Sequence, residues 1–192
     1  LRREIEPVEP DGFARFLPAW HGIGAARRGT EALVDAIGIL AGAPLVASTL
    51  ERDVLPARVA GYRAGALDEL CTSGDVVWLG AGAIGARDGR IRLCFADQVA
   101  VLAPGWEVPD PPQGALHAGL RELLAARGAL FWGQLREADA DATDAELLAA
   151  LWDLVWSGEV TNDSLAPLRA VLGGGGAAAP KRKAYGASRP RP

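Results

Sequence analysis

A ten-residue segment occurs twice in this chain and constrains its fold more than any other feature. Residues 67–76 read LDELCTSGDV and residues 151–160 read LWDLVWSGEV, an offset of 84 with five identical positions and two exchanges between Asp and Glu. Each copy has apolar residues at helical spacing followed by Ser-Gly, which predicts a helix that ends near the glycine and enters an extended segment. The repeat therefore indicates two copies of one helical module.

The residues around the first copy predict three helices and then a hairpin. Thr30 can cap a helix that ends at Gly42, and shorter helices are expected over 50–55 and 66–73. The period then changes to two, so 76–79 and 91–95 read as strands joined by a turn at 87–89. This order of elements is that of a winged helix.

The second copy follows the same plan without an obvious wing. One helix is expected over 116–124, and another opens with a capping box formed by Thr143 and Glu146. Residues 161–163 read as a turn and 165–172 as a helix. The predicted fold class is therefore mainly α with small β-hairpins (α+β), arranged as tandem winged-helix modules.

Proline-rich and glycine-rich stretches suggest where the modules begin and end. Phe13, Phe16, Leu17 and Trp20 share one face of an opening helix, which Pro18 is expected to end or kink. The predicted parts are a linker and docking helix (1–29), winged-helix module 1 (30–104), a Pro-rich linker (105–115), winged-helix-like module 2 (116–172) and a flexible basic tail (173–192).

Residue usage excludes several kinds of chemistry. Lysine occurs only at 181 and 183, so the folded part has no P-loop or Schiff-base lysine. The two histidines and two cysteines lack the spacing of a metal site, and Cys71 and Cys94 read as buried thiols. Residues 80–85 match G-x-G-x-x-G but lead into another strand, which favours a flexible hairpin connection over a dinucleotide site. We expect no catalytic residue, cofactor or metal here.

No apolar run approaches the eighteen or so residues that a membrane span requires. We therefore expect a soluble, cytoplasmic protein without membrane partners. The chain has no methionine and its last residues have linker composition, so we expect a segment of a larger protein.

Charge is distributed unevenly along the chain. Residues 105–172 hold four basic and eleven acidic residues, whereas 173–192 hold five basic and none acidic. Contact with nucleic acid would therefore depend on local arginine clusters. The candidates surround the third helix and the hairpin: Arg58, Arg63, Arg87, Arg90 and Arg92. Arg90 and Arg92 are expected opposite Ile91 and Leu93, and solvated hairpin arginines remain an alternative. Trp152 and Trp156 suit packing better than base stacking.

Four runs resemble the bacterial large helicase-related protein family, Lhr. They are FARFLPAW at 13–20, LERDVLPARV at 50–59, residues 67–85, and ALWDLVWSGEVTND at 150–163. The resemblance implies an ATP-dependent DNA helicase of repair whose motor domains, with ATP and Mg, lie outside this chain. It also implies a C-terminal region of tandem winged helices and a β-barrel, similar in fold to certain DNA glycosylases. No catalytic residue can be assigned from it.

The expected function is a non-catalytic tandem winged-helix segment that engages DNA, single-stranded or duplex, and contacts the other domains of the parent helicase. One alternative is a protein-interaction or oligomerisation module, in which the chain forms a homo-oligomer. Another is a scaffold part of a DNA glycosylase-like region.

Overall fold

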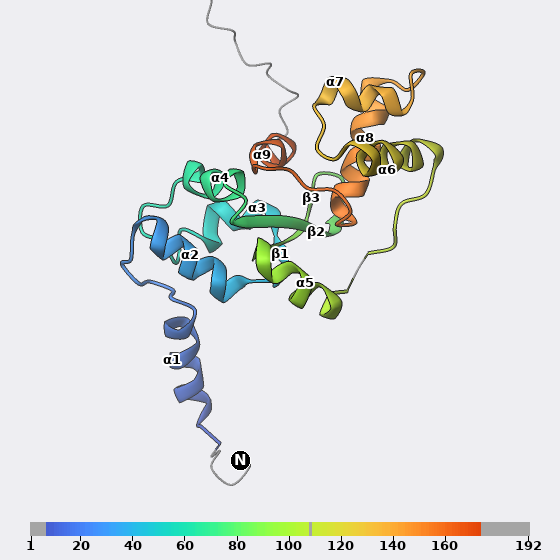
Figure 1. The fold of residues 1–192 in the computed structure, drawn as a ribbon. Coiled ribbons are helices and arrows are strands. Elements are labelled where there is room, and N and C mark those ends of the chain that lie inside the picture. The colour runs from blue at the N-terminus through green and yellow to red at the C-terminus, as the bar shows by residue number, and fades with distance from the viewer. Residues whose placement is uncertain (1–6, 108, 174–192) are drawn as a thin grey trace, which may run out of the picture.

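The computed structural model describes residues 7–107 and 109–173 (Figure 1). The predicted basic tail therefore lies, from residue 174 on, outside the described residues. The helices are α1 (Pro10–Trp20), α2 (Gly29–Leu40), α3 (Ala47–Thr49), α4 (Ala64–Thr72), α5 (Val99–Leu102), α6 (Ala115–Arg127), α7 (Trp132–Leu135), α8 (Asp144–Trp156) and α9 (Ala166–Leu172). The strands are β1 (Leu45–Val46), β2 (Val76–Ile84) and β3 (Asp88–Phe95).

Helices α2, α3 and α4 form the predicted three-helix part of the first module. A π-helical turn at Leu50–Val54 continues α3, so this helix covers the predicted region before Pro56. Helix α2 starts at Gly29, and its N-cap is Arg28 without a side-chain cap. The cap predicted at Thr30 is therefore wrong, because Thr30 lies inside the helix and the N-cap stands two residues earlier.

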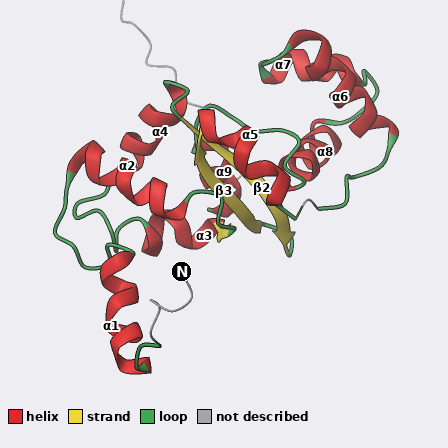
Figure 2. Cartoon of the chain, turned by 60° about the horizontal axis from the view of Figure 1, so that its bottom comes forward, coloured by secondary structure: helices red, strands yellow, loops and turns green. Residues whose placement is uncertain are grey.

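The sheet is antiparallel with the strand order β1-β3-β2 (Figure 2). Strand β1, which the sequence did not indicate, pairs Leu45 with Ile91 of β3. Strand β2 is longer than expected and runs through Gly80 and Gly82 with a bulge between Gly80 and Ala83. The flexible connection predicted for the glycine-rich run is thus a paired strand. Three helices and this sheet make an α+β winged helix.

The second module contains α6, α7 and α8, with no strand among its described residues. The predicted capping box is confirmed: the amide of Glu146 donates to the hydroxyl of Thr143, and the Thr143 amide donates to the Glu146 carboxylate. The three helices bury a small core of their own that consists of Leu120, Leu135, Leu147, Ala150 and Leu154.

The repeated helix ends are confirmed at the level of single hydrogen bonds. The Ser73 hydroxyl donates to the Leu70 carbonyl and to Asp75, and the Ser157 hydroxyl donates to the Leu154 carbonyl and to Glu159. The glycine that follows each serine has a φ near +80° (81° at Gly74, 82° at Gly158). The first copy then enters β2, whereas residues 160–163 form no strand.

The two modules share the larger hydrophobic core. Val155 and Trp156 from the end of α8, and Leu165 and Leu168 around α9, pack into the core of residues 32–93. Figure 1 shows the β2–β3 hairpin between the helices of the first module and α8, with α9 beside α4. The predicted second module, 116–172, is therefore not packed as a separate unit, because the end of that segment completes the core of the first module.

Helix α1 projects from the body, and its apolar face has no cover among the described residues (Figure 1). Phe13, Phe16 and Trp20 are 50%, 51% and 64% exposed. Pro18 lies within the helix, which continues to Trp20, so of the two expected effects of Pro18 the helix end is wrong. The helix has the amphipathic character predicted for a docking helix.

Candidate nucleic-acid interface

Helix α4 occupies the recognition position of the winged helix, but its outward side is acidic. No basic residue lies between Ala64 and Thr72, and Glu69 is exposed. Helix α9 covers one flank, where the Arg169 guanidinium donates to Asp68 at 2.8 and 3.1 Å and to Glu51 at 2.5 and 3.0 Å. The hydrogen bonds that Asp68 accepts, first those from Arg169 and then the one from the Leu165 amide, hold the pKa of Asp68 below its usual range. Helix α4 is therefore poorly suited to reading bases in a groove.

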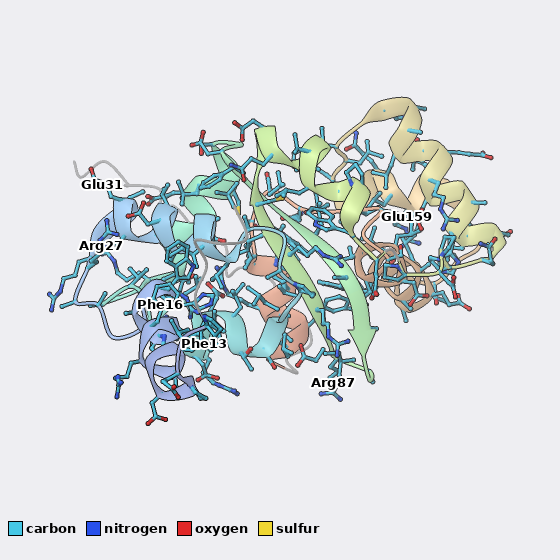
Figure 3. All side chains as sticks on the ribbon, turned by 90° about the horizontal axis from the view of Figure 1, so that it is seen from below. Phe13, Phe16, Arg27, Glu31, Arg87 and Glu159 are labelled. Carbon is cyan, nitrogen blue, oxygen red and sulfur yellow. The ribbon has the colours of Figure 1, made fainter. Side chains whose placement is uncertain are left out.

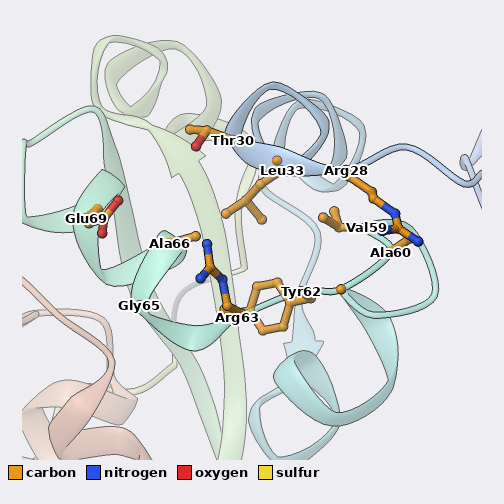
Figure 4. A pocket seen from close by; sticks show the side chains of 12 residues that line it. Arg28, Thr30, Leu33, Val59, Ala60, Tyr62, Arg63, Gly65, Ala66 and Glu69 are labelled. Atoms are coloured by element: carbon orange, nitrogen blue, oxygen red, sulfur yellow. The ribbon is translucent and has the colours of Figure 1, made fainter.

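Two arginines instead flank a pocket at the start of α4. Arg63 is the N-cap residue of α4, Arg28 is the N-cap residue of α2, and both line a pocket of about 530 Å³ (Figure 4). Neither helix has a side-chain cap, so their first amides remain available to an anion. Thr30 and the carboxylate of Glu69 also line this pocket. Two cations and two positive helix ends outweigh the one carboxylate.

The pocket arginines have no acidic partner within salt-bridge distance among the described residues, and in this they differ from most arginines outside the hairpin. Arg27 pairs with Asp35, Arg121 with Glu159 at 2.5 Å, Arg127 with Glu137 at 2.7 Å, and Arg136 with Asp144. A paired guanidinium must give up its carboxylate before it binds a phosphate, so the unpaired ones are the better candidates.

Arg58, which the sequence indicated with Arg63, is half-buried. Its guanidinium donates to the carbonyl of Val54 at 2.8 Å, and burial lowers its pKa. This side chain braces the turn that follows the π-helical segment.

The hairpin presents two of its three candidate arginines to solvent. Arg87 and Arg90 are exposed at the tip, where the Asp88 carboxylate accepts hydrogen bonds from the amide (3.2 Å) and hydroxyl (2.6 Å) of Ser48. These bonds fix the turn against α3. Figure 3 shows Arg27, which directly precedes the pocket arginine Arg28 in the chain, at the left and Arg87 well apart from it at the lower edge of the hairpin. The structure thus divides the candidates into two separate groups.

Arg92 differs from the other candidates because it is only 7% exposed. It lies on the predicted face of β3, but Trp106 covers it, with the guanidinium carbon 5.1 Å from the ring centroid. One of its nitrogens donates to the Glu107 carbonyl at 3.1 Å. The expected exposure of Arg92 is wrong, because the segment after β3 folds back over the sheet.

Sequence reasoning missed Arg28. No local pattern connects Arg28 with Arg63, because only the packing of α2 against α4 brings the two helix starts together. The available signal was an arginine directly before each helix.

Other kinds of site find no support among the described residues. No group of three or more His, Cys, Asp or Glu side chains could hold a metal ion within 7–107 and 109–173. In the same ranges, no helix is long and apolar enough to cross a membrane. Both cysteines are buried, and burial raises the pKa of Cys71 to about 11.

Residues 8–96, which include α1 to α4 and the complete sheet, match the family model described as large helicase-related protein, winged-helix domain. This part of the chain is a winged-helix domain of the Lhr family. The chain is 41% identical over 194 residues to the Lhr helicase/probable uracil glycosylase of Mycolicibacterium smegmatis, and 34% identical over 212 residues to the Lhr helicase/uracil glycosylase of Escherichia coli. Both alignments cover the whole chain, which spans only 12% and 14% of these Lhr proteins.

Proposed function

We propose that this chain is a non-catalytic winged-helix segment that helps an Lhr-type helicase to engage DNA. The observation that carries the proposal concerns Arg28 and Arg63, which have no acidic partner within salt-bridge distance among the described residues. They stand at two helix starts without side-chain caps around one pocket. Guanidinium groups and helix N-termini are common phosphate ligands. The acidic outer side of α4 favours backbone contact over base reading.

Arg87 and Arg90 at the hairpin tip form a second contact area in this proposal. A wing commonly meets the sugar-phosphate backbone, and these side chains are exposed at its end. Of the arginines first considered, Arg63, Arg87 and Arg90 stay in the proposed interface. Arg58 and Arg92 support the fold around it.

Salt-dependent binding tests the proposal. Fluorescence anisotropy of a labelled duplex and a labelled single strand, titrated between about 25 and 150 mM NaCl, gives the slope of log affinity against log salt. If Arg28 and Arg63 each contact one phosphate, replacing both by Ala should flatten this slope by about 2 units. The Arg87→Ala/Arg90→Ala variant should have a similar effect.

The matched control replaces two exposed arginines that already have acidic partners. Arg127 pairs with Glu137 and Arg136 with Asp144 in the second module. Replacing both by Ala removes the same charge and should leave the slope within about 0.5 units of the wild type. A control effect as large as that of the pocket variant, or no salt-sensitive binding at 25 mM NaCl, would overturn the proposal.

The catalytic functions would belong to the parent protein. The E. coli relative is named as a helicase and uracil glycosylase, and the M. smegmatis relative as a helicase and probable uracil glycosylase. In this proposal, ATP and Mg bind motor domains outside this chain, the parent works in DNA repair in the cytoplasm, and this segment contacts its other domains.

The exposed face of α1 favours a second candidate, a protein-interaction module. Phe13, Phe16 and Trp20 form an apolar stripe, and Phe16 and Trp20 lie 5.5 Å apart between ring centroids. Sedimentation of the chain over a range of concentrations tests the homo-oligomeric form of this function. Association that Phe13→Ser/Phe16→Ser abolishes, together with absent DNA binding, would favour it. Glycosylase activity that needs this segment within a longer Lhr protein would favour the scaffold alternative.

A further inference from the structure

A second cavity, of about 290 Å³, lies between the hairpin, the segment after β3 and the end of α8. Its walls are mainly apolar, from Leu79 of β2, Val99 of α5, Ala103 and Pro109. The other lining residues are Gly80, Arg92, Trp106, Glu107, Ser157 and Gly158. This cavity shares no lining residue with the pocket of Arg28 and Arg63.

Arg92 is a buried cation without an acidic partner within salt-bridge distance among the described residues. Its side chain is held by the Trp106 ring and by one hydrogen bond to the carbonyl of Glu107. The Nε atom is buried and has no acceptor. A buried guanidinium with an unsatisfied N–H and no carboxylate within salt-bridge distance is costly, so its surroundings favour an anion with an acceptor oxygen.

We propose that this cavity binds a monocarboxylate carried on a flat or branched apolar body. The carboxylate would accept from the planar guanidinium of Arg92, whose donors match its two oxygens. The apolar body would lie against Leu79, Val99 and Ala103.

The charges around the cavity favour a carboxylate over a phosphate. Arg92 is the one cation among the lining residues, and Glu107 is close enough to affect its pKa, which burial lowers and Glu107 raises. The end of α8 at Ser157 and Gly158 adds the negative partial charge of a helix C-terminus. A doubly charged phosphate would meet repulsion there, and the apolar walls offer it few donors.

The carboxylate can come from a free small molecule or from the C-terminal residue of another polypeptide. Benzoate represents the first source, and a short peptide that ends in leucine represents the second. The matched neutral probes are benzamide and the same peptide with a C-terminal amide. Binding of either acid well above its neutral partner supports the site, and the stronger of the two identifies the source.

The indole N–H signal of Trp106 in a ¹H–¹⁵N spectrum, assigned with Trp106→Phe, reports binding directly. We expect saturable shifts with a Kd on the order of 1 mM for benzoate, as for a small fragment, and at least tenfold weaker binding of benzamide. Equal binding of acids and amides, or no saturation by about 20 mM, would overturn the proposal.

Two variants test separately the charge of Arg92 and the volume of the cavity. Arg92→Met removes the charge at similar size and should weaken benzoate binding at least tenfold, while the other indole signals stay in place. Ala103→Leu keeps Arg92, fills part of the cavity and should also prevent binding. If Arg92→Met does not fold, Ala103→Leu alone decides, and unchanged benzoate binding in that variant would contradict the site.

Discussion

Gly80 of β2 lies directly against the backbone of Val155 at the end of α8. A Cβ atom on Gly80 would stand 1.8 Å from the carbonyl oxygen of Val155. Gly158, just after the end of α8, is equally close to the strand, because a Cβ on it would stand 2.8 Å from the Gly80 carbonyl oxygen. The glycine-rich run that resembles a nucleotide-binding motif thus permits close packing of a helix end on a strand.

Gly80→Ala should separate these two backbones and destabilise the fold. Overpacking commonly costs about 1–3 kcal/mol, and we expect at least the upper end because backbone atoms must move. Urea unfolding followed by circular dichroism measures the change. Gly65→Ala is the control, since Gly65 lies in α4 and a Cβ added to it would meet nothing within 4 Å. It should change stability by less than about 1 kcal/mol. Equal effects would contradict the packing.

Trp156 should contribute far more to stability than an exposed tryptophan. It is 8% exposed, packs on Gly89 and lies 5.3 Å from Trp152 between ring centroids, whereas Trp132 is 39% exposed. We expect Trp156→Ala to cost about 3–5 kcal/mol and Trp132→Ala less than about 1 kcal/mol in thermal or urea unfolding. Similar losses would mean that α8 does not complete the first core.

The Arg169 cluster should stabilise α9 on the first module. Removing its charge by Arg169→Gln leaves the carboxylates of Glu51 and Asp68 without their shared partner. We expect a loss of about 1–2 kcal/mol at pH 7 in urea unfolding. Arg136→Gln breaks a more exposed pair with Asp144 and should cost less than about 0.5 kcal/mol.

The stability lost in Arg169→Gln should depend on pH in a defined way. The pKa of Asp68 is lowered in the folded protein, mainly by its hydrogen bond from Arg169. A lowered carboxyl pKa adds stability that is complete above the unfolded value of about 4 and disappears as pH falls through the folded value. The difference between wild type and Arg169→Gln should therefore be constant from about pH 7 to 5 and shrink below about pH 4. A difference that grows toward acid would refute this assignment.

The two thiols should resist alkylation in the folded protein. Burial raises the pKa of Cys71 to about 11 and also raises the pKa of Cys94, so at pH 8 neither forms much thiolate. Iodoacetamide followed by mass measurement should show little modification until urea unfolds the chain, after which both cysteines should react. Rapid modification of the native protein would show that one of these sites is open.

The sequence by itself determined the features that depend on neighbouring residues. Ser73 and Ser157, each followed by a glycine and then an acid, make the same local hydrogen bonds, so the repeat predicted both helix ends. Thr143 and Glu146 close their capping box within one turn. The period-two pattern after Gly74 likewise indicated the hairpin, because strand pairing across a short turn is a short-range event.

Only the tertiary structure decided which residues are exposed and which sites they form. Alternation placed Arg92 on the outer face of β3, but no local pattern shows that Trp106 returns to cover that face. Arg28 and Arg63 line one pocket because α2 packs on α4. Gly80 is needed because α8, 75 residues later at Val155, ends against it. Such contacts join segments that are distant in the chain, so their residues carry no shared local signal. Burial and pairing, rather than residue type, then separate the arginines available to a phosphate from those that hold the fold together.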